Sequence, residues 1–116
     1  MPEQTKAIDK EILNKIKQII LDTANNYNIK INKIILFGSR ARGDYNEYSD
    51  WDILIVTEDK LNKELETHFS YCVHRKLVDL LDSAIDLLII DKEKFEERKN
   101  DIGYVYYWAN KEGIVL

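Results

Sequence analysis

A short apolar run that ends in a glycine–serine pair constrains this chain more than any other feature. The run, Lys33–Phe37, is rich in β-branched residues, which predicts a buried strand. Gly38 then predicts a turn, and Ser39 is a favourable N-cap for a helix that begins directly after it. A strand, a glycine turn and a helix start present free backbone N–H groups to an anion, and we expect a phosphate there.

Two acidic residues stand at the head of the next apolar run. Asp50 and Asp52 flank Trp51 and lead into Ile53–Val56, which predicts a second strand over residues 51–57. Alternate residues of a strand share one face, so Asp50 and Asp52 are expected to point the same way. A phosphate-binding turn beside two aligned carboxylates indicates metal-assisted transfer of a phosphoryl or nucleotidyl group.

A third acid interrupts a third apolar run. Ala84–Ile90 predicts a strand that is apolar throughout except for Asp86, and burial of an unpaired carboxylate costs several kcal/mol. We therefore expect a cation near Asp86. Asp50, Asp52 and Asp86 are the candidate metal ligands, because carboxylate oxygens suit hard cations such as Mg²⁺ or Mn²⁺. Asp86 could bind a second ion and accept the proton of an attacking hydroxyl group.

Each of these acids also has an ordinary structural interpretation. Asp50 fits a loop acid, Asp52 a solubilising residue at a strand edge, and Asp86 a turn residue with satisfied hydrogen bonds. A lone Asp-x-Asp and a lone Gly-Ser pair are weak signals. Their combination favours a site: an apolar strand, Gly-Ser, ten residues, Asp-x-Asp at the next strand, and one more acid inside a third strand.

Two arginines follow the Gly-Ser pair within one helical turn. The planar guanidinium group suits phosphate recognition, so Arg40 or Arg42 could contact a triphosphate. The alternative is that one or both pair with Asp or Glu on the surface. The predicted nucleotide-binding set is Gly38, Ser39, Arg40 and Arg42.

Helical patterns separate and surround the strands. Isoleucines at helical spacing predict an amphipathic first helix that ends near Asn25–Asn26 and covers the sheet: Ile8, Ile12, Ile16, Ile19 and Ile20. Further helices are predicted over Lys60–Asp82, with a break near His68–Tyr71 left open, over Asp91–Lys99 and over Tyr104–Asn110. The order predicts an α/β or α+β fold with a small sheet of at least three strands. A helix between each pair of strands permits parallel pairing, and mixed pairing remains open.

Length and composition narrow the class of protein. We expect one domain over residues 1–116, with the apolar (45%) and charged (33%) fractions of a soluble globular protein. No apolar run approaches the roughly 18–20 residues of a membrane span, and no secretory segment follows Met1, so a cytoplasmic protein is expected. The net charge of −4 argues against tight non-specific nucleic-acid binding. Nucleotides remain compatible, because a divalent ion can compensate their charge.

These motifs resemble those of a known superfamily. Gly38-Ser39, the ten-residue spacing and Asp50-x-Asp52 are similar to the signature of the nucleotidyltransferases that share a catalytic core with DNA polymerase β. The Gly-Ser-Arg-Ala-Arg-Gly and Ser-Asp-Trp-Asp forms resemble its minimal nucleotidyltransferase (MNT) branch. The later segments resemble that branch too: Ile85-Asp86-Leu87, Phe95–Lys99 and Ala109–Leu116. The resemblance covers the chain from Ile34 onward.

The resemblance implies a polymerase β-like core, with a small mixed sheet that carries all three acids on one face. It implies that the Gly-Ser turn holds the β- and γ-phosphates of ATP or another NTP. It further implies that Asp50 and Asp52 bind catalytic Mg²⁺ ions, two in number, and that Asp86 assists the acceptor hydroxyl. Members of this branch often pair with helical HEPN proteins as toxin–antitoxin systems. In those pairs the MNT protein resembles a protein adenylyltransferase that attaches AMP to a tyrosine of the toxin.

Two other functions stay open at this point. The chain could be a non-catalytic antitoxin that neutralises its partner by binding. An aminoglycoside-type nucleotidyltransferase shares the chemistry, but it usually requires an additional helical domain that this chain lacks. The sequence does not decide the acceptor, the nucleotide preference, whether the site acts without its partner, or whether the protein forms homo- or hetero-oligomers.

Overall fold

The computed structural model describes residues 9–116, and Ile8 of the predicted first helix lies outside the described residues. In the described chain, helices separate and surround the strands, as the periodicity predicts. In order, the elements are α1 (Lys10–Asn26), β1 (Ile31–Phe37), α2 (Ser39–Arg42), β2 (Trp51–Thr57), α3 (Lys63–Leu81), β3 (Ile85–Asp91), α4 (Lys92–Arg98), α5 (Val105–Glu112) and β4 (Ile114–Val115). The predicted α+β fold class is confirmed.

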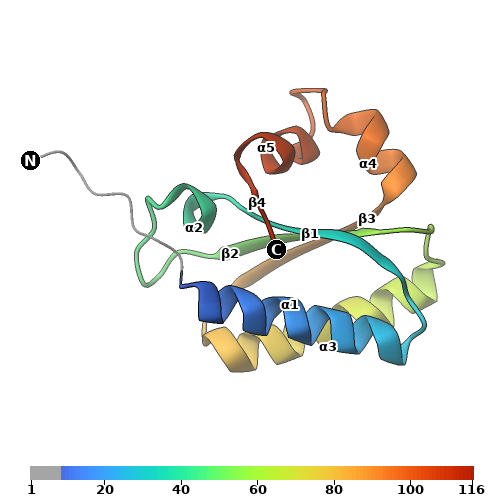
Figure 1. Ribbon diagram of the computed structural model, residues 1–116, viewed down its shortest axis with the longest axis horizontal. Coiled ribbons are helices and arrows are strands. Elements are labelled where there is room, and N and C mark those ends of the chain that lie inside the picture. The colour runs from blue at the N-terminus through green and yellow to red at the C-terminus, as the bar shows by residue number, and fades with distance from the viewer. Residues whose placement is uncertain (1–8) are drawn as a thin grey trace, which may run out of the picture.

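The sheet is mixed and has the strand order β3-β2-β1-β4 (Figure 1). β1 runs antiparallel to both β2 and β4, whereas β2 and β3 are parallel. The connections explain these directions. α2 is a single turn at the end of β1, so the chain turns back into β2 there. α3 instead crosses one face of the sheet and returns the chain to the same end, which is what a parallel pair requires.

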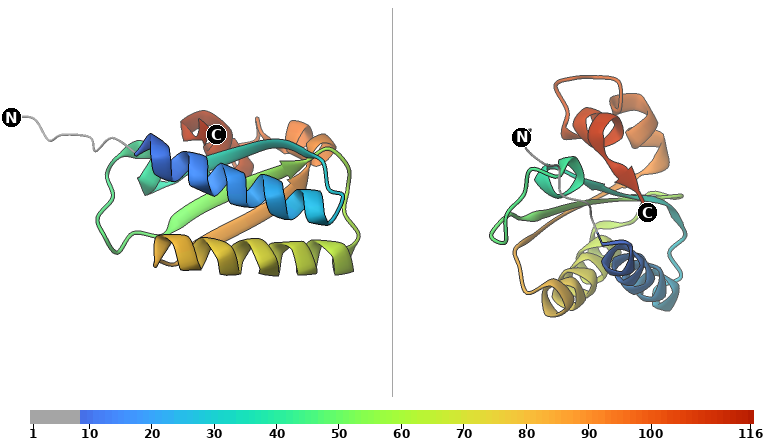
Figure 2. Two further views of the ribbon diagram at one scale, coloured as in Figure 1. Left: turned by 60° about the horizontal axis from the view of Figure 1, so that its bottom comes forward. Right: turned by 60° about the vertical axis from the view of Figure 1, so that its left-hand side comes forward.

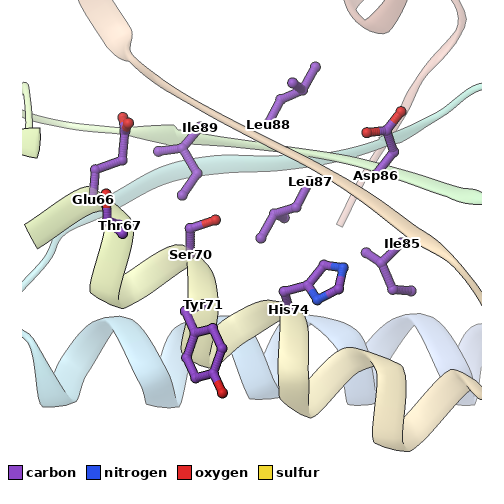
Figure 3. Close-up of a pocket in the computed structure, with 10 residues that line it drawn as sticks. All are labelled: Glu66, Thr67, Ser70, Tyr71, His74, Ile85, Asp86, Leu87, Leu88 and Ile89. Carbon is purple, nitrogen blue, oxygen red and sulfur yellow. The ribbon is translucent and has the colours of Figure 1, made fainter.

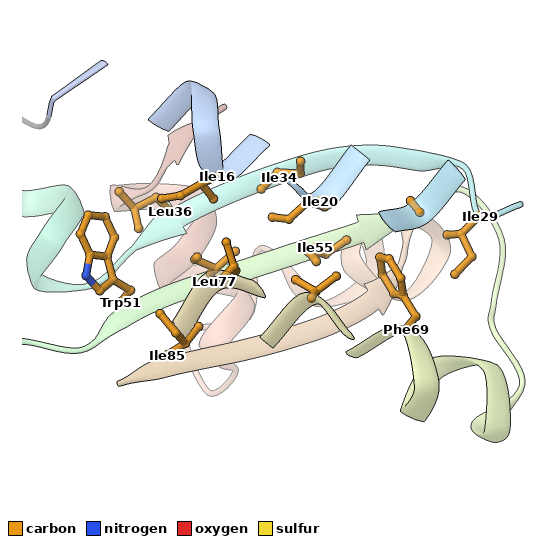
Figure 4. Close-up of a cluster of buried hydrophobic side chains, with 13 residues drawn as sticks. Ile16, Ile20, Ile29, Ile34, Leu36, Trp51, Ile55, Phe69, Leu77 and Ile85 are labelled. Carbon is orange, nitrogen blue, oxygen red and sulfur yellow. The ribbon is translucent and has the colours of Figure 1, made fainter. Parts of the chain in front are cut away.

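Helices cover both faces of the sheet (Figures 1 and 2). α1 and α3 lie on one face, where residues such as Ile16, Ile20, Phe69 and Leu77 form the larger core (Figure 4). α4 and α5 lie on the other face, where a smaller core surrounds Phe95. Strand alternation assigns the residues of the sheet: along β2, odd-numbered side chains join the larger core and even-numbered ones face α4 and α5.

Several boundaries differ from the sequence prediction. β1 begins at Ile31 rather than Lys33, and β3 covers Ile85–Asp91 rather than 84–90. α3 begins after Asn62, whose side-chain Oδ1 accepts a hydrogen bond of 2.8 Å from the Leu65 N–H, and it continues unbroken to Leu81. The residues of β4 were not predicted as a strand, because a two-residue strand has no periodicity and is defined only by its pairing with β1. Within residues 9–116, no helix is long and apolar enough to cross a membrane.

Candidate active site

Two of the three predicted acids meet because of the register between β2 and β3. Asp52 and Asp86 are directly paired across the two parallel strands, near the start of each. Asp52 lies two residues before Leu54, and Asp86 two residues before Leu88. Alternate residues of a strand share one face, so both acid side chains lie on the sheet face that also carries α4 and α5. The register between β2 and β3 cannot be predicted from the sequence of either strand alone. The proximity of these two carboxylates is therefore a property of the assembled sheet.

Asp52 lies in an electrostatically unfavourable place for a carboxylate. Burial raises its pKa above the ordinary value, and the negative charges of Asp86 and Asp50 raise this pKa further. A hydrogen bond between the Asp52 and Asp86 carboxyl groups acts in the same direction, whereas the positive charge of Arg42 lowers the pKa. Neighbouring carboxylates that repel one another in this way favour a bound cation, which would relieve the repulsion.

The other two acids are more open than the sequence suggested. Asp86 is exposed, because β3 is an edge strand, so the burial penalty expected for it does not arise. We expected Asp86 to be buried and therefore to require a cation nearby. Because Asp86 is exposed, this argument for a cation is wrong. Asp50 is also exposed and lies one residue before β2. Among residues 9–116, no three His, Cys, Asp or Glu side chains are already grouped closely enough to hold a metal ion.

The glycine turn and Asp52 form one unit. Gly38 adopts φ 72° and ψ −159°, a conformation that is essentially restricted to glycine. A Cβ atom on Gly38 would lie only 2.1 Å from Asp52 Oδ2 and 3.0 Å from its Cγ. The backbone of the turn therefore lies directly against the carboxylate, and a side chain at position 38 would displace it.

Ser39 is not the N-cap that the sequence predicted. The N-cap of α2 is Gly38, Ser39 is the first helical residue, and no side chain caps this helix. The turn lies at Gly38 as predicted, but the helix begins one residue earlier than expected. The N–H groups of Ala41 and Arg42 donate to the Gly38 carbonyl at 3.1 and 3.0 Å. This leaves the N–H groups of Ser39 and Arg40 without an intrahelical acceptor.

Arg40 is buried between two aromatic side chains. Its side chain is buried (7% exposed), and its Nη2 donates to the Ser49 carbonyl at 3.0 Å. Its guanidinium carbon lies 4.5 Å from the centre of the Trp51 ring and 4.6 Å from that of Tyr45. The Trp51 ring belongs to the core under α1 and α3, the face opposite Asp52. Through these contacts Arg40 connects the loop that carries Asp50 to the end of the sheet.

Arg42 forms surface ion pairs. Its Nε lies 3.3 Å from Asp44 Oδ2, and its Nη1 lies 3.3 Å from Glu112 Oε2. Hydrogen bonds to these two acids raise the pKa of Arg42, and the bond to Glu112 has a larger effect than the bond to Asp44. This is the surface pairing that the sequence left open as the alternative to phosphate binding. Exposed pairs of this kind contribute little stability, so a bound anion could compete for the guanidinium group.

Comparisons with known proteins decide the family. A family model described as a nucleotidyltransferase domain matches residues 10–112. This chain belongs to the nucleotidyltransferase family. A relative from Methanocaldococcus jannaschii, MJ0604, is named as a candidate protein adenylyltransferase. It is 37% identical to this nucleotidyltransferase over 87 residues, which are 73% of this chain and 79% of the relative.

Solved structures share the fold of this nucleotidyltransferase. One is a candidate minimal nucleotidyltransferase, with a TM-score of 0.60 and 22% identity over 96% of this chain and 99% of that chain. Another is a chain in the structure of a tri-AMPylated Shewanella oneidensis HEPN toxin in complex with an MNT antitoxin. It has a TM-score of 0.57 and 22% identity, and covers 93% of this chain and 71% of that chain. At these identities the likeness shows a common fold.

The donor set of this nucleotidyltransferase fits a small divalent cation. Mg²⁺ is usually bound through one or two carboxylates, with water and substrate phosphates completing its coordination, rather than by a complete cage of side chains. The adjacent carboxyl groups of Asp52 and Asp86, with the raised pKa of Asp52, match that requirement. Asp50 is near enough to influence the pKa of Asp52.

The sequence reasoning missed the aromatic residues that support the loop of this nucleotidyltransferase. Tyr45 and Trp51 enclose Arg40, whereas the sequence pattern assigns Trp51 only to the start of a strand, between two acids. Its position offered a signal, since strand alternation places it on the face opposite Asp50 and Asp52. An arginine one turn after the glycine and an aromatic residue on that opposite face could have suggested a stacked pair.

Proposed function

We propose that this nucleotidyltransferase transfers AMP from ATP to a hydroxyl group of a protein, with the help of a divalent cation. The observation that carries the proposal is the contact between the Gly38 backbone and the Asp52 carboxylate, beside Asp86. It joins a turn suited to phosphates with carboxylates suited to a cation. The name of the archaeal relative and the AMPylated toxin in a structural neighbour support transfer of AMP to a protein.

Each group in the site has a proposed role. Asp50 and Asp52 hold Mg²⁺ or Mn²⁺, and Asp86 contributes to a second ion. The free N–H groups of Ser39 and Arg40, with the Ser39 hydroxyl, hold the β- and γ-phosphates. A divalent cation supplies neutralisation of charge on the phosphate oxygens and on the leaving pyrophosphate. Arg42 exchanges its surface partners, Asp44 and Glu112, for the triphosphate.

These groups support the following reaction. The acceptor hydroxyl oxygen forms a bond to the α-phosphorus of ATP, and the bond from that phosphorus to the bridging oxygen of pyrophosphate breaks. Asp86 accepts the hydroxyl proton, a role open to a carboxylate within hydrogen-bonding reach. Because Asp86 is exposed at an edge strand, a protein acceptor can approach it directly. We propose that the acceptor is a tyrosine of a HEPN-type toxin, which makes this protein a catalytic antitoxin.

The test uses ATP labelled at either the α- or the γ-phosphate. With Mg²⁺ and a HEPN-type protein as the acceptor, the α-label should move to that protein and the γ-label should not. Asp52→Asn should lower transfer by at least about a hundredfold, because it weakens both cation binding and charge neutralisation. Asp79→Asn, an exposed acid on α3, is the matched control and should transfer at the wild-type rate.

Two results would contradict the proposal. One is transfer that survives Asp52→Asn, or that continues after a chelator has removed divalent cations. The other is full protection from the toxin by an Asp50→Asn/Asp52→Asn double variant that transfers no label. That second result would establish the alternative, an antitoxin that acts by binding alone.

A further inference from the structure

A groove of about 630 Å³ runs along the open edge of the sheet and ends at Asp86 (Figure 3). One wall is the outer side of α3 between Glu66 and His74, and the other is β3 from Ile85 to Ile89. Figure 3 shows Ser70 and His74 of α3 on one side of this space and Leu87 and Ile89 of β3 on the other. The groove therefore reaches Asp86, one of the two paired acids of the proposed active site.

The edge of β3 is suited to bind another strand. β3 ends the strand order, so within the described chain it pairs with β2 alone, over seven consecutive residues without a bulge. An edge strand directs every second set of N–H and C=O groups outward. Natural edges are usually protected by Pro, Lys, a bulge or a very short strand, and the middle of β3, Leu87–Ile89, has none of these protections. The opposite edge differs, because β4 has only two residues.

Strand alternation along β3 separates two kinds of contact. Leu87 and Ile89 point toward α3 and the larger core, whereas Asp86 and Leu88 point to the other face (Figure 3). A strand added beside β3 would alternate in the same way. One set of its side chains would pack into the groove beside α3. A residue directly opposite Asp86 would place its Cβ about 5 Å from that of Asp86, within reach of the carboxylate.

The charge of the groove indicates which kind of peptide segment it would bind. Among its described lining residues are two acids, Glu66 and Asp86, and no Lys or Arg. A segment with net positive charge would therefore be favoured over an acidic one. A second copy of β3 is less suitable, since it would bring two further acids, Asp86 and Asp91, to the same edge.

We infer that β3 binds an extended, basic segment of the acceptor protein as an additional strand, with the hydroxyl side chain that receives AMP opposite Asp86. This inference rests on the proposed function, because it names the substrate segment of that same site. Main-chain hydrogen bonds would supply affinity, and the alternating side chains would supply specificity. The acid that accepts the proton and the strand that holds the acceptor would then be the same element.

The test begins with the peptide Lys-Val-Thr-Val-Tyr-Val-Thr-Val-Lys, whose sequence is the same in both directions, so that it can pair parallel or antiparallel to β3. Its binding is measured without nucleotide, by fluorescence anisotropy and by the shifts of backbone amide NMR signals. We expect the largest shifts at residues 85–89. The same peptide with N-methyl groups on its valines keeps the side chains but loses backbone donors, and it should bind about tenfold more weakly.

A pair of protein variants tests the groove itself. Ser70→Trp fills the space between α3 and β3 and should weaken peptide binding about tenfold. His68→Trp, on an exposed position of α3 outside the groove, is the matched control and should bind like the wild type. Circular dichroism and the thermal midpoint confirm that both variants are folded. If Ser70→Trp does not fold, Thr67→Trp, on the same wall, replaces it.

Several outcomes would overturn the inference. These are the absence of shifts along β3, equal binding of the N-methylated peptide, unchanged binding by the folded groove variant, or self-association through β3 seen in sedimentation. The result is distinguishable from failure of the proposed function. Peptide binding at β3 without AMP transfer would refute the reaction but not the docking. Transfer to the protein acceptor that Ser70→Trp leaves unchanged would refute the docking but not the reaction.

Discussion

The two faces of the sheet are covered to very different extents. α1 and α3 have 17 and 19 residues, or about 26 and 28 Å, and exceed the roughly 23 Å length of the seven-residue strands. α4 and α5 have seven and eight residues, or about 10–12 Å each. The long helices therefore extend along the full length of the strands on their face. The short ones do not cover Asp86, which is exposed near the start of β3.

This difference separates stability from chemistry. Most of the fully buried apolar side chains belong to the core under α1 and α3, which surrounds Phe69 and Leu77. The opposite face has a smaller core around Phe95, and the acid pair lies beyond it on the same face. A domain this small can leave part of one sheet face open because the other face supplies most of its buried apolar surface.

The largest expected effect tests this division of the core. Phe69→Ala should lower the free energy of unfolding by about 3–5 kcal/mol, because it leaves a cavity where a fully buried ring contacts Tyr27 edge to face. Phe95→Ala, which is equally buried on the other face, should cost less, since the short α4 can shift to fill the space. Urea denaturation measures both values. A larger loss of unfolding free energy for Phe95→Ala than for Phe69→Ala would contradict the prediction.

A smaller effect is expected at the junction of the two regions. Gly38→Ala should lower the free energy of unfolding by about 1–3 kcal/mol, because φ is 72° and the new Cβ would lie 2.1 Å from Asp52 Oδ2. It should also abolish AMP transfer by displacing Asp52. Gly103→Ala is the matched control, with Asp101 Oδ1 as its nearest neighbour at 3.3 Å, and should be nearly neutral. Thermal melts and the label-transfer assay read the two effects separately.

The smallest effect concerns pH. The pKa of Asp52 is raised in the folded protein by burial and by Asp86 and Asp50, so the folded state holds its proton more tightly than the unfolded state. Without divalent cations this group should therefore destabilise the fold progressively as the pH rises from the unfolded pKa through the raised folded pKa. The destabilisation is complete above the folded value and absent below the unfolded one.

The measurement is the difference in thermal midpoint between wild type and Asp52→Asn across this pH window. The difference should favour the variant increasingly as the pH rises, and added Mg²⁺ should reduce it in the wild type by stabilising the carboxylate. Glu58 and Glu96, whose pKa values are lowered by their hydrogen bonds, act in the opposite direction in both proteins and cancel in the difference. Parallel curves for the two proteins would contradict the prediction.

Local patterns in the sequence determined much of this protein. The apolar runs predicted the three longer strands, with β2 placed over Trp51–Thr57 as observed, and the isoleucine spacing predicted α1. The Gly-Ser turn followed by Asp-x-Asp predicted the family, which the match over residues 10–112 confirms. These features follow from neighbouring residues along the chain, because strand and helix periodicity and turn chemistry are local properties.

Only the tertiary structure decided what lies against what. The pairing of Asp52 with Asp86 depends on strand register, and the exposure of Asp86 depends on β3 being an edge strand. Arg40 and Arg42 look equivalent in the sequence, yet one is enclosed by Trp51 and Tyr45 while the other pairs with Glu112, seventy residues away. Backbone pairing and side-chain partners at such separations are set by the packed arrangement of the whole chain, which no local pattern encodes.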